Sequence, residues 1–393
     1  MTRTADVVVI GGGANGTSTA FHLTLLGVRN VVLLERRELA AGATGKSGAL
    51  VRMHYTNETE SRLAHESLRV FRNFGEIVGG DCGFEGVGFV QLVGPQYAAV
   101  LHRNVERQQR LGINTRAITP AEVREILPGC EIADVGAAAW EADSGFADPA
   151  ATAFAFAEAA RNRGATIETG VEVLRVLTEG GRVTGVETSA GRIATSQVVI
   201  VAGAWASTLL GPLGLDYGLM PHRIQVSIFH WPAGFTQRHP AVIDAIHKAW
   251  WRPEGRASTL IGVELGVSHG DPEKFHEGVD EPYVAGCRAA LAARWPRFAG
   301  ATMRGGWAGM IMMSPDGRPI IGPLGIEGLW GMLGDSGTSF KTSPAIGRCL
   351  AEWIATGAAS TADLQPFRAS RFAEGRPWRD ADHYGRERLT ISR

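Results

Sequence analysis

Cysteine is scarce in this chain of 393 residues, and its four cysteines are scattered. Zinc sites and disulfide scaffolds use cysteines at short spacings, and no Cys-x-x-Cys pair occurs here. The sequence therefore argues against a metal site, a disulfide framework and an iron–sulfur cluster, and we expect a reducing, cytoplasmic compartment. The four residues are Cys82, Cys130, Cys287 and Cys349.

Long apolar runs and an excess of one charge are missing as well. No run reaches about 18 uninterrupted apolar residues, so we expect no membrane span. The net charge of −1 argues against nucleic acid as a partner. The first apolar run begins near residue 5, and we therefore expect no signal peptide.

Glycine is abundant, with 51 of 393 positions. Tight turns and close approaches of backbone to ligand both use glycine, so this abundance favours a loop-rich nucleotide-binding enzyme over a helical bundle. The length exceeds that of one simple core, and we expect two domains.

The N-terminal segment carries the most specific pattern in the chain. An apolar run, Val7–Ile10, precedes three glycines that fit Gly-x-Gly-x-x-Gly. A helical stretch follows, and a second apolar run, Val31–Leu34, ends at Glu35. This order of strand, glycine turn, helix, strand and acid is that of a Rossmann-type dinucleotide-binding unit. The glycines are Gly11, Gly13 and Gly16.

Each residue of this unit has a physical task. Gly11 permits the tight turn, Gly13 lets the backbone approach a pyrophosphate, and Gly16 lets helix and strand pack closely. The helix N-terminus offers free N–H groups and a positive dipole end to the phosphates. Glu35 is placed to accept hydrogen bonds from the hydroxyls of an adenosine ribose.

The rest of the chain alternates between two kinds of pattern. We expect helices over 58–78, 96–111, 149–163, 281–294 and from Ser343 to Gly357, and a short one that begins at Thr119-Pro120. We expect strands over 85–95, 198–201, 224–230, 260–265 and 328–333, a three-stranded meander over 171–195, and irregular chain over 136–147.

These patterns predict an α/β fold with two interleaved domains. The dinucleotide-binding domain takes 1–83, 148–219 and 305–393, and an antiparallel-sheet (α+β) substrate domain takes 84–147 and 220–304. Such interleaving favours a tightly held flavin over a nicotinamide cofactor. We expect the substrate pocket to be lined mostly from 84–147 and 220–265.

Four further motifs carry a resemblance that spans nearly the whole chain: AGATGKSGALVRMHY, VIVAGAW, MSPDGRPIIGP and LGDSGTSFKTSPAIGRCLAEWI. Together with the opening motif they resemble the D-amino-acid oxidase superfamily, in its sarcosine oxidase, glycine oxidase and dimethylglycine dehydrogenase branch. The resemblance implies a glutathione-reductase-like FAD domain, non-dissociating FAD, and oxidation of a secondary or primary amine.

The resemblance also implies which residues hold the cofactor. Loop 41–47 would pass the flavin, Val173 would pair its backbone with the adenine, and the segment before the helix at Ser343 would face the flavin N1–C2=O side, where the helix dipole suits negative charge. The full set is Gly11, Gly13, Asn15, Gly16, Glu35, Arg36, Thr44, Gly45, Lys46, Ser47, Val173, Ala202, Gly203, Trp205, Gly337, Thr338, Ser339 and Lys341.

Plainer roles compete at several of these positions. The 41–47 loop could be an ordinary surface loop, and Val173 an ordinary strand valine. Gly203 and Trp205 could mark only a bend at the end of a strand.

Arg52 and Lys341 match the positions where sarcosine-oxidase-like enzymes hold a substrate carboxylate. An arginine fork suits a carboxylate and lysine adds a point charge; the alternative is that both are surface cations. His54 and Tyr55 could line the same pocket or be packed rings. Whether Trp250 and Trp251 shape the pocket roof or fill the core is left open.

The chain departs from the family pattern at two places. Some relatives attach FAD through a cysteine near Gly309 or a histidine in the 42–48 loop, and neither residue type is present there, so we expect non-covalent FAD. Monomeric sarcosine oxidases use a lysine to activate oxygen at a position that aligns with Leu260. The sequence therefore leaves open whether the electron acceptor is O2 or another molecule.

Three functions are consistent with these residues. The first is oxidation of a small amine or amino acid by hydride transfer to flavin N5, which gives an imine that hydrolyses. The second is a 2-hydroxy-acid or glycerol-phosphate-type dehydrogenase, which needs a base such as His54 or His222. The third is a flavoprotein subunit of a multi-chain complex, and the chain could also form a homodimer.

Overall fold

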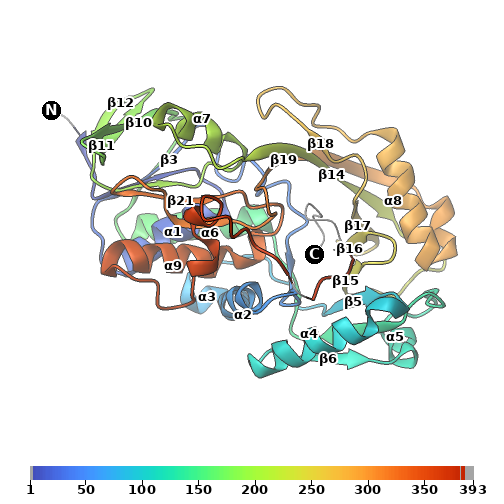
Figure 1. The fold of residues 1–393 in the computed structure, drawn as a ribbon. Coiled ribbons are helices and arrows are strands. Elements are labelled where there is room, and N and C mark those ends of the chain that lie inside the picture. The colour runs from blue at the N-terminus through green and yellow to red at the C-terminus, as the bar shows by residue number, and fades with distance from the viewer. Residues whose placement is uncertain (1–2, 381, 386–393) are drawn as a thin grey trace.

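A computed structural model describes residues 3–380 and 382–385 (Figure 1). Its N-terminal body is built on a mixed sheet with the strand order β20-β21-β13-β2-β3-β9. The pairs among β21, β13, β2, β3 and β9 are parallel, and β20 pairs antiparallel with β21. The strands are β2 (Val7–Ile10), β3 (Val31–Glu35), β9 (Thr166–Thr169), β13 (Val198–Ile200), β20 (Ile320–Pro323) and β21 (Leu329–Leu333).

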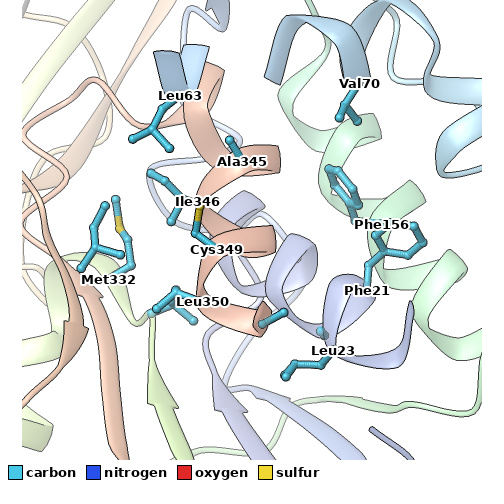
Figure 2. Packing of buried hydrophobic residues seen from close by; sticks show 14 of the residues in the cluster. Phe21, Leu23, Leu63, Val70, Phe156, Met332, Ala345, Ile346, Cys349 and Leu350 are labelled. Atoms are coloured by element: carbon cyan, nitrogen blue, oxygen red, sulfur yellow. The ribbon is translucent and has the colours of Figure 1, made fainter. Parts of the chain in front are cut away.

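Helices from distant parts of the sequence cover this sheet and share one core. Figure 2 shows Phe21 of α1, Phe156 of α6 and Leu350 of α9 in the same apolar cluster. α1 is buried along nearly its whole length because it lies between α9 and α6. The helices of this core are α1 (Ala14–Leu25), α2 (Glu58–Arg72), α3 (Phe74–Ile77), α6 (Pro149–Asn162) and α9 (Ser343–Thr356). The short helix α7 (Ala206–Leu210) packs instead in a second cluster with Val8 and Ile10 of β2.

The expected meander is confirmed as a small sheet with the order β1-β12-β11-β10, at the upper left of Figure 1. Its turns place glycine at positive φ, as at Gly180 (φ 58°) and Gly181 (φ 79°). The strands are β1 (Arg3–Thr4), β10 (Val173–Glu179), β11 (Arg182–Thr188) and β12 (Gly191–Ala194).

The second body is a large sheet with the order β18-β14-β17-β16-β15-β5-β7-β6, and β19 pairs with β14. Its pairs are antiparallel except β15 with β5. The elements are β5 (Phe89–Val93), α4 (Ala98–Arg110), β6 (Thr115–Ile118), α5 (Pro120–Ile126), β7 (Ala137–Glu141), β14 (Met220–His230), β15 (Ala241–Asp244), β16 (Ala249–Glu254), β17 (Ser258–Val263), β18 (Ser268–His269), α8 (Glu281–Arg294) and β19 (Met303–Met313).

The remaining elements are two short strands and several 3-10 helices. β4 (Leu50–Val51) pairs with β8 (Gly145–Phe146) beside the pocket described below. The 3-10 helices are η1 (Pro95–Tyr97), η2 (Gly203–Trp205), η3 (Gly211–Leu213), η4 (Pro296–Gly300), η5 (Phe340–Thr342), η6 (Gln365–Phe367) and η7 (Ala369–Arg371).

The structure differs from the sequence expectations at three places. The 58–78 helix breaks at Asn73, whose side chain donates to the Arg69 carbonyl at 2.8 Å and so competes with the backbone ladder. The segment 136–147 is not irregular but forms β7 and β8, because neighbouring strands supply the pairing that its alanines do not predict. The long strand β19 crosses the expected boundary at 304/305, and all of it that follows the boundary still pairs with β14 in the large sheet (Figure 1).

Candidate active site

The glycine turn after β2 leaves no room for side chains. Gly11 has φ 117°, and a Cβ there would lie 2.5 Å from the Val201 carbonyl oxygen. A Cβ at Gly16 would overlap the Gly11 carbonyl oxygen, and one at Gly13 would lie 2.9 Å from the Thr44 hydroxyl. The backbone at the N-terminus of α1 is therefore open to a ligand on one side and in contact with β13 and the 41–47 loop on the other.

A cavity of about 1780 Å³, part of it open to solvent, extends from this turn to the start of α9. Its lining runs from the glycine turn and Glu35 to the segment before α9 and takes in residues of both bodies, an extent that suits a dinucleotide together with a substrate. It is lined by 16 of the 18 residues expected to bind the cofactor: Gly11, Gly13, Asn15, Glu35, Arg36, Thr44, Lys46, Ser47, Val173, Ala202, Gly203, Trp205, Gly337, Thr338, Ser339 and Lys341.

Two of the expected cofactor residues do not line the cavity. Gly16 packs against Gly11 and Val201 inside the turn. Gly45 lies in a turn of its own, where its N–H donates to the Ala40 carbonyl at 2.8 Å. Both glycines form the turns that carry lining residues, but they do not themselves contact the cavity.

The polar groups of the lining fit FAD. Glu35 accepts hydrogen bonds from the Gly12 N–H and the Arg37 N–H, both at 2.8 Å, and these bonds fix its carboxylate at the cavity wall. Asn15 donates to the Ser339 hydroxyl at 3.2 Å, while its own carbonyl oxygen is buried without a hydrogen-bond partner. A buried acceptor of this kind needs a donor from a bound group.

Arg52 and Lys341 meet at one aromatic ring. The Arg52 guanidinium carbon lies 4.7 Å from the centroid of the Tyr55 ring, and the Lys341 ammonium lies 5.3 Å from it. Tyr55 and Lys341 both donate to the Thr338 carbonyl, at 3.2 and 3.0 Å. The fold thus joins the β4 segment and the segment before α9 into one cationic end of the cavity.

Arg52 is buried, with 2% of its surface exposed. One of its terminal nitrogens donates to the His54 carbonyl, and its Nε has no hydrogen-bond partner. No carboxylate among the described residues lies within the ion-pair distance of 4.0 Å. Burial lowers the pKa of Arg52, and the Glu141 carboxyl opposes that change at longer range. A buried cation in this state needs an anion.

Glu141 lies behind Arg52 and is fully buried. Its carboxyl accepts hydrogen bonds from the Met53 N–H at 2.9 Å and the Ser144 hydroxyl at 2.6 Å. Burial raises the pKa of Glu141, because these bonds and the Arg52 charge only partly offset its desolvation. Glu141 therefore holds the backbone beside Arg52 in place.

The two histidines considered as bases do not line the cavity. The His54 ring Nε2 lies 2.7 Å from the Tyr384 hydroxyl, and burial lowers the pKa of His54 to about 3. His222 is buried on β14 against His269, with ring centroids 4.5 Å apart. The expectation that His54 takes part in catalysis therefore has no support from its position, since its ring is packed away from the lining.

The two adjacent tryptophans, Trp250 and Trp251, lie in different environments. Trp250 lines the cavity, whereas Trp251 is fully buried in the core of the second body. Successive strand residues point to opposite faces, and β16 carries both. Contrary to expectation, no residue of 84–147 lines the cavity.

Two acidic residues of the second body, Glu273 and Glu277, contact residues of the cavity lining, and we call this region the mouth of the cavity. Glu273 accepts from Arg36 at 2.6 Å and from the Trp205 indole at 2.7 Å, and Glu277 pairs with Lys46. The pKa of each of these carboxyls is lowered, chiefly by the hydrogen bond to its basic partner.

The positions considered above for covalent attachment hold neither cysteine nor histidine. The four cysteines are buried in apolar clusters, and none lines the cavity. A Cβ at Gly309 would lie 2.9 Å from the Lys46 Cβ. Leu260 is buried in an apolar cluster with Val226 and Ile228. Over the described residues, no helix has the length and apolarity to cross a membrane, and no group of three metal-ligating side chains forms.

Comparisons with known proteins agree with this geometry. The profile of the DAO family, described as FAD dependent oxidoreductase, matches residues 6–353. The sarcosine oxidase subunit beta of Arthrobacter sp is 28% identical over 385 residues, which are 95% of this chain and 92% of that protein. Mitochondrial dimethylglycine dehydrogenase of Rattus norvegicus is 26% identical over 90% of this chain and 43% of its own length.

A solved structure has the same fold. The crystal structure of L-proline dehydrogenase from P. horikoshii matches with a TM-score of 0.86 and 27% identity, over 95% of this chain and 99% of that one. The α/β fold and the resemblance stated from the motifs are thereby confirmed. With its glycine turn, its dinucleotide-sized cavity and a family profile that spans most of its length, the chain belongs to the DAO family of FAD-dependent oxidoreductases.

Proposed function

We propose that this chain oxidises the C–N bond of a small amine that carries a carboxylate, with non-covalently bound FAD. The observation that carries the proposal is Arg52: it is buried at the end of the cavity, its Nε lacks a partner, and it shares the Tyr55 ring with Lys341. A substrate carboxylate on Arg52, with the Lys341 charge beside it, would supply the anion that Arg52 lacks.

The residues of the cavity orient the substrate rather than take its proton. Bound FAD supplies the two-electron acceptor. Arg52 and Lys341 would fix the carboxylate, so that the amine-bearing carbon is held at one place along the cavity. A neutral amine contributes its own lone pair to the oxidation, and no side-chain base is required.

The alcohol alternative is less well supported. Oxidation of a hydroxy acid needs a base within hydrogen-bond reach of the hydroxyl. Among the described residues that line the cavity there is no histidine, and both His54 and His222 lie outside the lining. The amine reaction therefore fits the available side chains better.

Two parts of the proposal concern the cofactor and partners. The lack of cysteine and histidine in the described lining supports non-covalent FAD, which acid precipitation tests: the yellow flavin should stay in the supernatant. The name of the Arthrobacter relative, a subunit, supports a partner chain as a further proposal. Activity of the purified chain alone with an artificial acceptor would remove the need for that partner.

Anaerobic titration of the purified holoenzyme tests the reaction. Sarcosine, other N-methyl amino acids, D- and L-amino acids and 2-hydroxy acids are added in turn, and the flavin band near ~450 nm is followed. We expect an amine to bleach the band, and Arg52→Ala or Lys341→Ala to weaken this by roughly 10²–10³-fold in kcat/KM. The matched control is Arg304→Ala, an exposed arginine on β19.

Two results would contradict the proposal. Bleaching by hydroxy acids alone would favour the alcohol reaction. Equal losses in Arg304→Ala and Arg52→Ala would show that the cationic end has no special role. Readmission of air after bleaching then tells an oxidase from a dehydrogenase.

A further inference from the structure

The wall of the cavity that faces away from the glycine turn is built by the large sheet. Of the described residues, every side chain that this sheet contributes to the lining is apolar. These side chains come from β14, β15, β16 and β19, and they are Ile224, Val226, Ile243, Trp250 and Ile311.

The pattern along β14 shows that this apolar wall is a property of one face. Ile224 and Val226 are two positions apart and line the cavity, whereas Gln225 between them points to the other side and bonds to Asp280 at 2.9 and 2.8 Å. Arg223, Gln225 and Ser227 thus face away from the cavity, whereas His222 alternates with Ile224 and Val226 but lies outside the lining. Among the described residues, the indole nitrogen of Trp250 is the one polar side-chain atom that the sheet contributes to this wall, and it lies against Gly262.

Trp250 is the largest side chain of the wall, and two glycines fix its place. Gly262 lies opposite it on β17, and a Cβ there would come within 2.5 Å of the indole. A Cβ at Gly48, in the cofactor-side loop, would overlap the far edge of the same ring. The indole therefore spans the gap between the large sheet and that loop.

Apolar packing on two further sides holds the indole. It contacts one cluster that includes Leu50 and Ile243, and a second that includes Val226 and Leu260. A side chain confined by two glycine backbones and two clusters cannot turn aside for a larger ligand without moving the sheet or the loop. It sets a fixed limit to the space on this side of the cavity, and the ring centroid of Phe89, in its first cluster, lies 5.6 Å from the Arg52 guanidinium carbon.

We infer that the substrate is an amino acid with a single carboxylate and a compact aliphatic remainder, and that Trp250 determines the size of that remainder. The inference rests on the proposed function: the carboxylate occupies Arg52 and Lys341, and the rest of the molecule faces the apolar wall. A second carboxylate, a hydroxyl or an ammonium on that side would be buried without a partner.

The test compares a matched set of substrates. N-methyl derivatives of glycine, alanine, leucine, phenylalanine and aspartate are titrated anaerobically into wild-type holoenzyme, Trp250→Phe, Trp250→Ala and the control Trp330→Phe. Trp330 is a half-buried tryptophan of the other body, bonded to Gln197 at 2.6 Å and outside the cavity lining. The readout is the ratio of kcat/KM between substrates, which cancels a general loss of active enzyme.

We expect the wild type to prefer the small aliphatic substrates over N-methylaspartate by at least ~10-fold. Trp250→Ala should move the ratio of N-methylphenylalanine to N-methylglycine by at least ~10-fold toward the larger substrate, with Trp250→Phe in between. Trp330→Phe should leave the ratio unchanged. A wild-type preference for the dicarboxylate, or an unchanged size ratio in Trp250→Ala, would overturn the inference.

A binding measurement separates this inference from the proposed function. Acetate, isovalerate, phenylacetate and succinate cannot be oxidised at a C–N bond, and their Kd values are read from the perturbation of the flavin spectrum. If no amine bleaches the flavin, the proposed function fails; the apolar wall still predicts that isovalerate binds more tightly than succinate. It also predicts that phenylacetate gains affinity in Trp250→Ala, or in Trp250→Leu should the alanine variant not fold. Equal affinities in all variants would refute the role of Trp250.

Discussion

The two ends of the cavity are built in different ways. At the nucleotide end, a short continuous segment shapes the wall through its backbone, with Gly11, Gly13 and Gly16 in close contact with their neighbours. At the substrate end, side chains from four strands of another body form the wall, and the two cations come from positions 52 and 341. The first end depends on the absence of side chains, and the second on their identity.

The largest expected effect comes from placing a side chain at the nucleotide end. In Gly16→Ala the new Cβ overlaps the Gly11 carbonyl oxygen, and since backbone cannot move aside, we expect loss of bound FAD and of stability. The ratio of flavin to protein absorbance and the melting temperature measure this. Gly27→Ala is the control: its φ of 87° costs about 1–2 kcal/mol, but nothing lies within 4 Å. Normal FAD content in Gly16→Ala would show that the turn tolerates a side chain.

At the proposed substrate end, we expect activity to depend on the planar geometry of the Arg52 guanidinium as well as on its charge. Arg52→Lys keeps the charge but loses the planar fork, so we expect kcat/KM to fall by about tenfold, less than in Arg52→Ala, with FAD content unchanged. Steady-state kinetics with the best amine measure it, and Arg304→Lys serves as the control. Loss of FAD in Arg52→Lys would mean that the two ends are not separable.

Acid sensitivity should be similar in the two bodies. Burial lowers the pKa of His22, in the first body, and of His239, in the second, to about 4 from the ordinary 6.5. Both stay neutral when folded and take up a proton when unfolded, so stability is lost as pH falls below 6.5, by up to about 2 kcal/mol per histidine at pH 5. Denaturant unfolding at pH 7 and pH 5 should show a smaller acid loss in His22→Gln and His239→Gln than in the wild type. The same acid loss in both variants would contradict these pKa shifts.

The smallest effect is expected at the mouth. Glu273 and Glu277 make exposed ion pairs with Arg36 and Lys46, and such pairs contribute about 0–1 kcal/mol and are screened by salt. Glu273→Gln and Glu277→Gln should therefore change the FAD release rate by less than about fivefold, and not at all in high salt. Glu374→Gln, which breaks an exposed pair with Arg368, is the control. If either mouth variant were purified without FAD, these carboxylates would contribute more to FAD binding than exposed ion pairs do.

The same contrast explains how much the sequence could predict. The glycine turn and Glu35 follow one another closely along the chain, so their spacing alone predicts the Rossmann-type unit and the nucleotide end of the cavity. Arg52 and Lys341 stood out only through the family resemblance, because their meeting at Tyr55 depends on tertiary packing.

The sequence located the apolar wall only to a range, since 220–265 was expected to line the pocket and four of the five wall residues lie there. Ile224, Val226 and Ile243 read as ordinary strand residues, and only the face that each strand presents decides which of them reach the cavity. For the same reason the sequence could not tell Trp250 from Trp251. It also assigned pocket residues to 84–147, none of which lines the cavity, although Phe89 of β5 lies beside Arg52.

The Tyr55 ring brings together two cations that are synthesised at very different times. During synthesis the glycine turn emerges first, and β3 and α1 follow it closely in sequence. Arg52 emerges early as well, but its cationic partner follows 289 positions later, after every strand of both bodies has been made. The nascent chain can therefore acquire nucleotide-binding structure before Lys341 joins Arg52 at Tyr55, and under the proposed function the carboxylate site is complete only then.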